Sequence, residues 1–419
     1  MNLIKSIEIK YLRSIHRLKM KDVGALTVFS GANDVGKSNL LKALNLFFNN
    51  HIDWETPIDF YQDFSLRRLD EVRSESIKGK QFISVTIQFQ RPDNYKNSLP
   101  PTFSVTKTWL RDSKTPQETN DLESRTQQGR LPSSEATARR MLSQFLNRIR
   151  FEYVPAIRDR SYYAYVLRNL QDTLLSQPMQ SDDPVLDAVR ELNKEMGKRS
   201  EYLKTDFLNS TGIEAEVSLP VDPSALFSAF SVNTKWVSST EETLPLSLRG
   251  DGIQARYIPS LLHYIAKNSR YYWYIWGFEE PENSIEYNLS IELASRFIDT
   301  YSRSAQIFVS SHSPSFVSLQ GDGVVSYRVY KDDNTTEIAQ LYPSKDPSAL
   351  DRLHEEIGLF KIQTKLHKTY LERREELERI SVEADNLRME LSAMTRPIIS
   401  VGANGFRSTT FCRSGQLVR

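Results

Sequence analysis

Cysteine and long apolar runs are scarce in this sequence. Of 419 residues only Cys412 is a cysteine, which excludes an intramolecular disulfide framework and a cysteine-built metal site. No segment approaches the roughly 20 consecutive apolar residues of a membrane-spanning helix, and the charged N-terminus lacks the apolar core of a signal peptide. We therefore expect a cytoplasmic protein in a reducing compartment, with no membrane partner.

An excess of charge of one sign is also missing. The 54 Lys and Arg residues nearly balance the 53 Asp and Glu residues, which gives a net charge of +1. The chain as a whole is therefore not drawn to nucleic acid or to an anionic membrane. After Glu390 the tail contains four arginines and no acidic residue, at Arg396, Arg407, Arg413 and Arg419. So sparse a cluster is typical of a solvated end, and DNA binding is not indicated.

Two of the 16 glycines lie in one motif. Residues 31–38 read GANDVGKS, a complete match to G-x-x-x-x-G-K-[ST], between an apolar strand at 26–30 and an amphipathic helix at 38–48. Glycines let consecutive N–H groups surround phosphate oxygens at a helix N-terminus. The motif predicts ATP as ligand, with Lys37 on the β- and γ-phosphates and Ser38 on Mg²⁺. A ligand-free glycine turn is the alternative, and the complete strand–loop–helix context disfavours it.

An acidic motif follows a second buried strand. Residues 271–278 read YYWYIWGF and end in Glu279-Glu280-Pro281-Glu282. Two carboxylates at the end of a buried strand are costly unless a metal or water uses them. We assign Glu279 to the Mg²⁺ water shell and Glu280 to polarising the attacking water as general base. For Glu282 we expect a capping role at a helix that Pro281 opens and that extends to residue 299.

Two further elements accompany these motifs. His312 follows the buried strand at 306–310, where an imidazole can contact the γ-phosphate and sense its loss. Residues 246–254 read LSLRGDGIQ and are expected to open a helix at Ile253. By itself this second stretch is also explained as a cap and turn.

The four elements, in this order, resemble the ATP-binding cassette superfamily and its chromosome-maintenance and overcoming-lysogenization-defect branch. The resemblance covers residues 1 to about 330 and implies an α/β P-loop ATPase head of the ABC type. In that family two heads sandwich ATP head to tail, so that Ser247, Gly250 and Gly252 complete the neighbouring subunit's site. The nucleotide contacts within one subunit fall to Asn33, Gly36, Lys37, Ser38 and Asn39, and the catalytic roles to Glu280 and His312. The branch also implies a glutamine at Mg²⁺, for which Gln62, Gln81, Gln88 and Gln90 are candidates.

The predicted organisation places a helical arm between two halves of the head. We expect the first half at 1–100, a largely helical insertion at 101–240, the second half at 241–345, an amphipathic helix at 346–395 and a short basic tail at 396–419. The stretch 112–134 is expected to be a loop. The amphipathic helix carries an imperfect heptad seam, which fits a coiled coil or packing on the same chain equally well. Its members are Leu359, Leu366, Tyr370, Leu377, Ile380, Ala384, Leu387, Leu391 and Met394, with Gln363 and Arg373 as polar exceptions.

The C-terminal region departs from the full-length nucleases of the branch. Those carry a Toprim domain, whereas residues 396–402 read RPIISVG, like its first strand without the glutamate. A metal nuclease needs several convergent carboxylates, and the tail has none. We therefore expect an ATPase that is not itself a nuclease. The layout most resembles the ATPase component of the PARIS anti-phage family. That resemblance implies a homo-oligomer holding a separate Toprim-type toxin nuclease, which a phage-encoded trigger protein releases.

Two other functions compete with this interpretation. A DNA-repair ATPase of the RecF or structural-maintenance type would clamp DNA and should show a basic stripe and salt-sensitive binding. A binding module with ATP as a structural ligand would tolerate Glu280→Gln without loss of function. The retention of both carboxylates and His312 argues against the second.

Overall fold

A computed structural model describes the chain at residues 2–74, 81–113, 115–122, 125, 133–175, 191–192, 194–195, 198, 201, 232–234, 244–269, 272–342, 347–358 and 361–394. The chain divides into two units, Met1–Phe360 and Lys361–Arg419. In the described part, no helix has the length and apolar character needed to cross a membrane.

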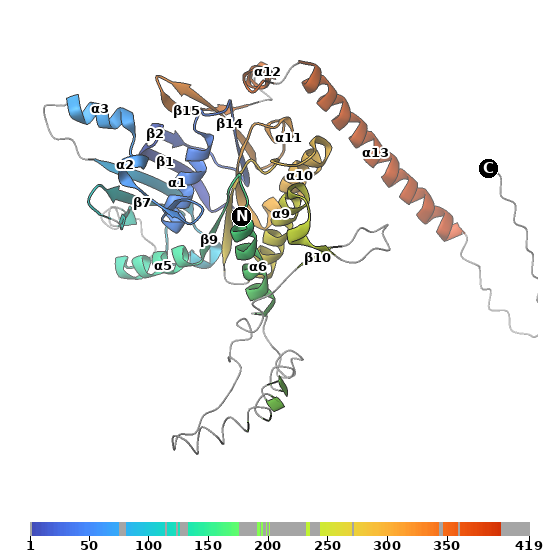
Figure 1. The fold of residues 1–419 in the computed structure, drawn as a ribbon, viewed down its shortest axis with the longest axis horizontal. Coiled ribbons are helices and arrows are strands. Elements are labelled where there is room, and N and C mark those ends of the chain that lie inside the picture. The colour runs from blue at the N-terminus through green and yellow to red at the C-terminus, as the bar shows by residue number, and fades with distance from the viewer. Residues whose placement is uncertain are drawn as a thin grey trace, which may run out of the picture. The chain divides into compact units, whose positions relative to one another are not determined.

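Two sheets form the framework of the first unit (Figure 1). The antiparallel sheet has the order β2-β1-β6-β7-β8, and the second sheet has the order β15-β14-β3-β13-β12-β9. In the second sheet the five strands from β14 to β9 are parallel and β15 is antiparallel. The strands of the first are β1 (Ile4–Leu12), β2 (Ile15–Met20), β6 (Phe82–Gln90), β7 (Thr102–Leu110) and β8 (Gln117–Asn120). Those of the second are β3 (Leu26–Ser30), β9 (Ile149–Val154), β12 (Trp273–Glu279), β13 (Ala305–Ser311), β14 (Val324–Asp332) and β15 (Thr335–Leu341).

Helices cover both faces of the six-stranded sheet. Helix α1 lies between the two sheets in one apolar core, which includes Leu44 and Phe308, while α6, α9 and α10 pack on the opposite face with Trp276 and Phe278 (Figure 1). This alternation follows from the strand period of two, because neighbouring side chains point to opposite faces. The helices are α1 (Lys37–Asn49), α2 (Phe60–Asp63), α3 (Leu66–Ser74), α5 (Glu135–Asn147), α6 (Arg160–Leu175), α9 (Asp251–Asn268), α10 (Tyr287–Asp299), α11 (Pro314–Val317), α12 (Pro347–Glu356) and α13 (Lys361–Met394).

Short elements complete the unit, and one buried glutamine joins the sheets. The Gln306 side chain on β13 accepts from the Ile4 N–H at 2.8 Å and donates to the carbonyls of Ile4 and Gly24 at 3.0 and 2.9 Å. The remaining elements are the strand pairs β4 (His51–Asp53) with β5 (Thr56–Pro57) and β10 (Asn233–Thr234) with β11 (Leu244–Pro245), and the 3₁₀ turns η1 (Asp93–Tyr95), η3 (Leu246–Leu248) and η4 (Tyr301–Arg303).

The region 101–240 differs from the predicted helical insertion. Strands β7, β8 and β9 all fall inside it and belong to the two sheets of the head, and β8 lies in the stretch expected to be a loop. Helix α5 does lie within the expected insertion, and its Leu142 and Phe145 are buried. Most of the remaining residues up to 231 lie outside the described part, so the helical arm stays a prediction.

Two other boundaries are corrected. The helix expected from residue 281 begins at Tyr287, because residues 281–284 form turns. The single amphipathic helix expected at 346–395 is two helices, α12 and α13. The tail 396–419, with its four arginines and Cys412, lies outside the described residues.

Candidate nucleotide site

Three strand ends bring the sequence motifs together. Strands β3, β13 and β12 are parallel neighbours, with Phe29 beside Ser310 and Ser310 beside Glu279. Their carboxyl ends therefore share one edge of the sheet, and this edge is where α/β folds bind ligands. The phosphate loop follows β3, the two glutamates end β12, and His312 follows β13.

Backbone conformation shapes the phosphate loop. Gly36 has φ of 100°, and a Cβ at this position would collide with the Thr336 hydroxyl. Only glycine adopts such a conformation without strain. The helix α1 starts at the next residue and has no acidic side chain in its first turn. An anion placed at this N-terminus would therefore meet helix N–H groups and no acidic side chain from the first turn of α1 itself.

Lys37 is a buried cation inside this loop. Its side chain is only 6% exposed, and Nζ donates to the carbonyls of Gly31 at 3.0 Å and Ala32 at 2.8 Å. Burial lowers the pKa of Lys37, with Glu280 and Glu282 acting in the opposite direction. A buried ammonium with carbonyl partners at a helix N-terminus fits the phosphates of a nucleotide.

Glu279 lies beside the start of α1. The carboxylate is 8% exposed, and Oε1 accepts a hydrogen bond from the Tyr153 hydroxyl at 2.9 Å. Burial raises the pKa of Glu279, while Lys42, Tyr153 and Ser38 lower it. One carboxylate next to a serine hydroxyl fits Mg²⁺, which takes few protein ligands and completes its shell with phosphates and water.

Glu280 forms a pair with His312. Nδ1 of His312 lies 3.2 Å from Oε1 of Glu280. This hydrogen bond lowers the pKa of Glu280 and raises the pKa of His312. Glu280 has a positive φ of 42°, its N–H donates to the Ser310 carbonyl at 2.9 Å, and its own carbonyl accepts from Nη2 of Arg158 at 3.0 Å. The backbone is thus held so that the side chain meets His312.

Glu282 does not cap a helix, which corrects the sequence interpretation. Its Oε1 accepts from the Ser311 hydroxyl at 2.6 Å and from the N–H groups of His312 and Ser313, each at 3.3 Å. Burial raises the pKa of this carboxyl, and α10 begins five residues later. Glu282 therefore ties the end of β13 to the acidic turn and places His312.

The signature stretch lies at the start of α9. Ser247 and Gly250 are exposed, and α9 begins at Asp251 rather than at Ile253. Gly252 packs so closely on the Ser284 carbonyl that a Cβ would collide with it. A surface hollow of about 250 Å³ lies here, lined by Gly250, Gly252, Ile253, Arg256, Ser284, Ile285, Glu286 and Leu289.

The other predicted contacts have separate positions. Asn33 is exposed in the phosphate loop. The Asn39 amide donates to the Ser14 hydroxyl at 2.8 Å, so that it braces α1 against the β1–β2 turn. The four candidate glutamines lie on α2, beside β6 or on β6, at Gln62, Gln81, Gln88 and Gln90. Among the described residues, side-chain hydrogen bonds reach Glu279 from Tyr153 and Ser38 rather than from a glutamine.

The sequence interpretation missed Tyr153 and Arg158. Tyr153 lies on β9, and Arg158 follows that strand, which pairs with β12 at the edge of the sheet. A signal was present, because residues 149–154 read IRFEYV and precede a proline, as expected of a buried strand that ends abruptly. The assignment of this region to a helical insertion concealed it.

Comparisons with known proteins agree with this geometry. Residues 3–137, which include the phosphate loop, match the family model AAA_15, described as an AAA ATPase domain. No curated protein matches the chain.

Among solved structures, an Smc head bound to the C-terminal winged-helix domain of ScpA is 14% identical, with a TM-score of 0.50. The match covers 82% of this chain and 99% of that one. The SMC head domain from Thermotoga maritima is 13% identical over 82% of this chain and 100% of that one, with a TM-score of 0.40. Residues 3–137 are thus similar to an AAA ATPase domain, and the chain has a fold similar to that of an SMC head.

Proposed function

We propose that this chain is the ATP-hydrolysing sensor and scaffold subunit of an anti-phage defence complex. In this role it holds a separate Toprim-type toxin nuclease inactive and releases it on detecting a phage-encoded protein. The observation that most supports ATP hydrolysis is the Glu280–His312 pair beside the phosphate loop. The defence role is supported by the order of the four motifs and by the residues Glu279-Glu280-Pro281-Glu282 of the acidic motif.

Different residues at this site hold the metal, bind the phosphates and orient the attacking water in the proposed hydrolysis. Bound Mg²⁺ would neutralise developing phosphate charge, and Ser38 and Glu279 are the residues to hold it. Lys37 binds the phosphates. Glu280 orients the attacking water, and its lowered pKa keeps it ionised, so that it acts through position and charge more than through basicity. His312 holds Glu280 and lies where it contacts the γ-phosphate.

The signature residues fit a site completed by a second copy. Ser247 and Gly250 are exposed on the described surface of their own chain. In a head-to-tail pair they would face the partner's nucleotide, with the helix N-terminus of α9 directed at its phosphates. We therefore propose a homo-oligomer that forms through ATP-bound heads.

The ATPase assignment is tested by Glu280→Gln. This variant keeps the size of the side chain and removes its charge, so we expect nucleotide binding to persist and turnover to fall at least about a hundredfold. Phosphate release and equilibrium binding of a fluorescent ATP analogue measure the two effects. Glu8→Gln on β1 is the matched control and should behave as wild type. Normal turnover in Glu280→Gln would refute the assignment of the base.

The defence role is tested by purifying the chain, with ATP, from cells that express it together with its native neighbouring genes. Native mass spectrometry then gives the mass and composition of the complex. A stoichiometric second protein with acidic metal-ligand motifs supports the proposal. A bare oligomer that binds DNA with a steep salt dependence would instead indicate a repair-type ATPase that clamps DNA.

A further inference from the structure

The hydroxyl of Tyr153 occupies a central position next to the predicted Mg²⁺ ligand. Tyr153 lies on β9, pairs in register with Gly277 of β12, and is only 3% exposed. Its hydroxyl donates to Oε1 of Glu279 at 2.9 Å. A phenol has a single proton to donate, so this bond fixes the rotation of the Glu279 carboxylate through one oxygen only.

A second carboxylate competes for the same hydroxyl, and a lysine neutralises it. Asp53, at the end of β4, is also hydrogen-bonded to Tyr153. Oδ2 of Asp53 accepts from Nζ of Lys42 at 2.6 Å, and Oδ1 accepts from the Trp54 N–H at 2.8 Å. The geometry directs the phenol proton to Glu279 at 2.9 Å, while these two donors offset the charge of Asp53.

The polar network closes on the phosphate-loop helix. Lys42 lies on α1, one turn after Ser38, so both side chains project from the same side of that helix. Lys42, Asp53, Tyr153 and Glu279 thus link α1, β4, β9 and β12 around the position assigned to the metal. Two of these elements, β4 and β9, lie outside the sequence motifs.

We propose that Tyr153 is a positioning residue for the Mg²⁺–nucleotide site, which holds Glu279 in the orientation that the metal's water shell requires. The proposal rests on the proposed ATPase function. Partners of this kind behind a metal ligand are worth about 10- to 100-fold in metal affinity.

The test is a Mg²⁺ titration of nucleotide binding with Tyr153→Phe in the full chain. A slowly hydrolysed fluorescent ATP analogue reports binding at each Mg²⁺ concentration, so the readout does not depend on turnover. We expect the Mg²⁺ concentration for half-maximal binding to rise about tenfold or more, with unchanged affinity in the absence of Mg²⁺. Lys42→Met should shift it in the same direction, because Asp53 then competes for the phenol proton.

Tyr165→Phe is the matched control. Its hydroxyl, on α6, also donates to a buried glutamate, Glu152, at 3.0 Å, and Glu152 precedes Tyr153 on β9 and so points to the opposite face of the sheet. This variant should leave the Mg²⁺ dependence as in wild type. An unchanged Mg²⁺ dependence in Tyr153→Phe, with normal binding by wild type, overturns the role of Tyr153. Absence of nucleotide binding by wild type would overturn the ATPase function together with it.

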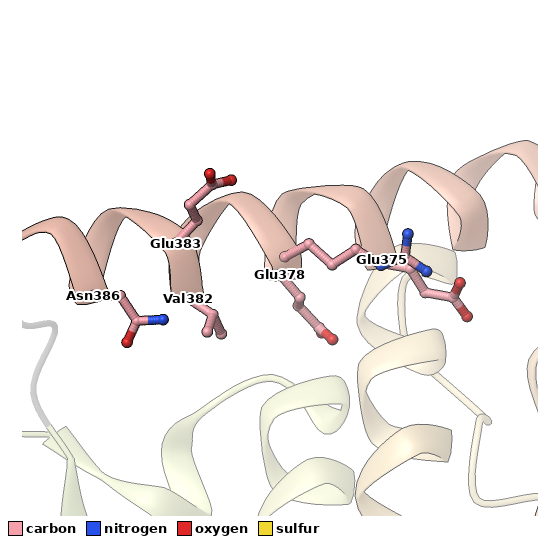
Figure 2. A pocket seen from close by; sticks show the side chains of 6 residues that line it. Glu375, Glu378, Val382, Glu383 and Asn386 are labelled. Carbon is pink, nitrogen blue, oxygen red and sulfur yellow. The ribbon is translucent and has the colours of Figure 1, made fainter.

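A different observation concerns α13. Side chains at the spacing of a heptad seam are more than half exposed along this helix, namely Leu377 (66%), Ile380 (56%), Leu387 (54%) and Leu391 (61%), with Ala384 between them. Figure 2 shows Glu383 directed to the opposite side of the helix from Val382 and Asn386. None of the seam residues lines the hollow formed by Glu375, Glu378, Arg379, Val382, Glu383 and Asn386, which lies on the face of the helix away from the seam, here called the outer face.

The charges beside the seam select a partner and a direction. One flank carries Glu376, Glu383 and Glu390, and the other carries Arg374 and Arg388. In a parallel pair Glu383 of each copy meets Arg388 of the other, whereas an antiparallel pair sets the glutamate flanks against each other. We infer that α13 forms a parallel coiled coil with a second copy of this chain.

Light scattering on the nucleotide-free full chain tests this inference. We expect a self-associated wild type, a monomer for Leu387→Glu in the seam, and no change for Val382→Glu on the outer face. In a Cys412→Ser background, Ile380→Cys and Leu391→Cys should each give a disulfide-linked dimer on oxidation. A monomeric wild type overturns the inference, and cross-linking at only one of the two positions overturns the parallel direction.

Discussion

At the scale of single residues, we expect nucleotide binding to depend most on the side chain of Lys37. Its ammonium group is buried and donates hydrogen bonds to two neutral loop carbonyls. The charged oxygens of a nucleotide's phosphates would accept stronger, charge-assisted hydrogen bonds from it. Lys37→Ala should weaken ATP binding at least roughly tenfold, the loss of one hydrogen bond to a charged group. Equilibrium binding measures the effect, with the exposed Lys19→Ala as control. Equal affinities of Lys37→Ala and wild type would contradict the phosphate role.

Burial of the Glu152 carboxyl makes the free energy of unfolding depend on pH. It is 7% exposed on β9, and burial raises its pKa to about 7, against the hydrogen bond from Tyr165. The folded state then holds a proton that the unfolded state releases near its ordinary pKa of 4.5. The stability contributed by this proton is fully present at low pH and is lost as the pH rises to about 7.

Glu152→Gln should remove this pH dependence. Because glutamine keeps the partner Tyr165 and carries no charge, the variant should gain about 2 kcal/mol of unfolding free energy on wild type between roughly pH 5.5 and pH 8. Urea unfolding at the two pH values measures the gain. Parallel stability profiles for the two proteins would show that Glu152 is ionised in the folded state.

At the scale of elements, we expect substitutions just before α9 to separate ATP binding from ATP hydrolysis. Ser247 is exposed on η3, so a substitution there leaves its own chain's phosphate loop untouched. We expect Ser247→Arg to keep the ATP affinity of an isolated subunit and to lower turnover at least about tenfold, because its contact lies across the interface. Ser74→Arg at the end of α3 is the control. Loss of ATP affinity in isolated Ser247→Arg subunits would place the signature in its own site.

Strand periodicity explains which elements were predictable. The strands β3, β12 and β13 and the helix α1 agree with their sequence patterns to within about two residues at each end. The predicted start of α10 was wrong, because Pro281 opens a turn and the Glu282 carboxylate accepts a hydrogen bond from Ser311 on the neighbouring strand β13. This contact joins residues that are 29 positions apart in the sequence, so no local sequence pattern predicts it.

At the scale of the whole molecule, ATP should govern association of the heads. We expect Glu280→Gln carrying Leu387→Glu, which removes the contribution of α13, to be monomeric without nucleotide and dimeric with Mg²⁺ and ATP. Adding Lys37→Ala should abolish this dimer. Sedimentation velocity at matched protein concentrations measures the change. A monomer under all conditions, despite measurable ATP binding, would contradict a site shared between two heads.

The sequence by itself determined which residues are candidates for nucleotide binding and hydrolysis, because the phosphate loop, the acidic strand end and His312 are local patterns of residues with fixed spacing. The tertiary structure alone decided which side chains surround them. Tyr153 meets Glu279 and Arg158 meets the Glu280 backbone only because β9 pairs with β12, more than a hundred residues away. Contacts of that kind depend on sheet order, and sheet order follows from the packing of the whole head rather than from any one segment.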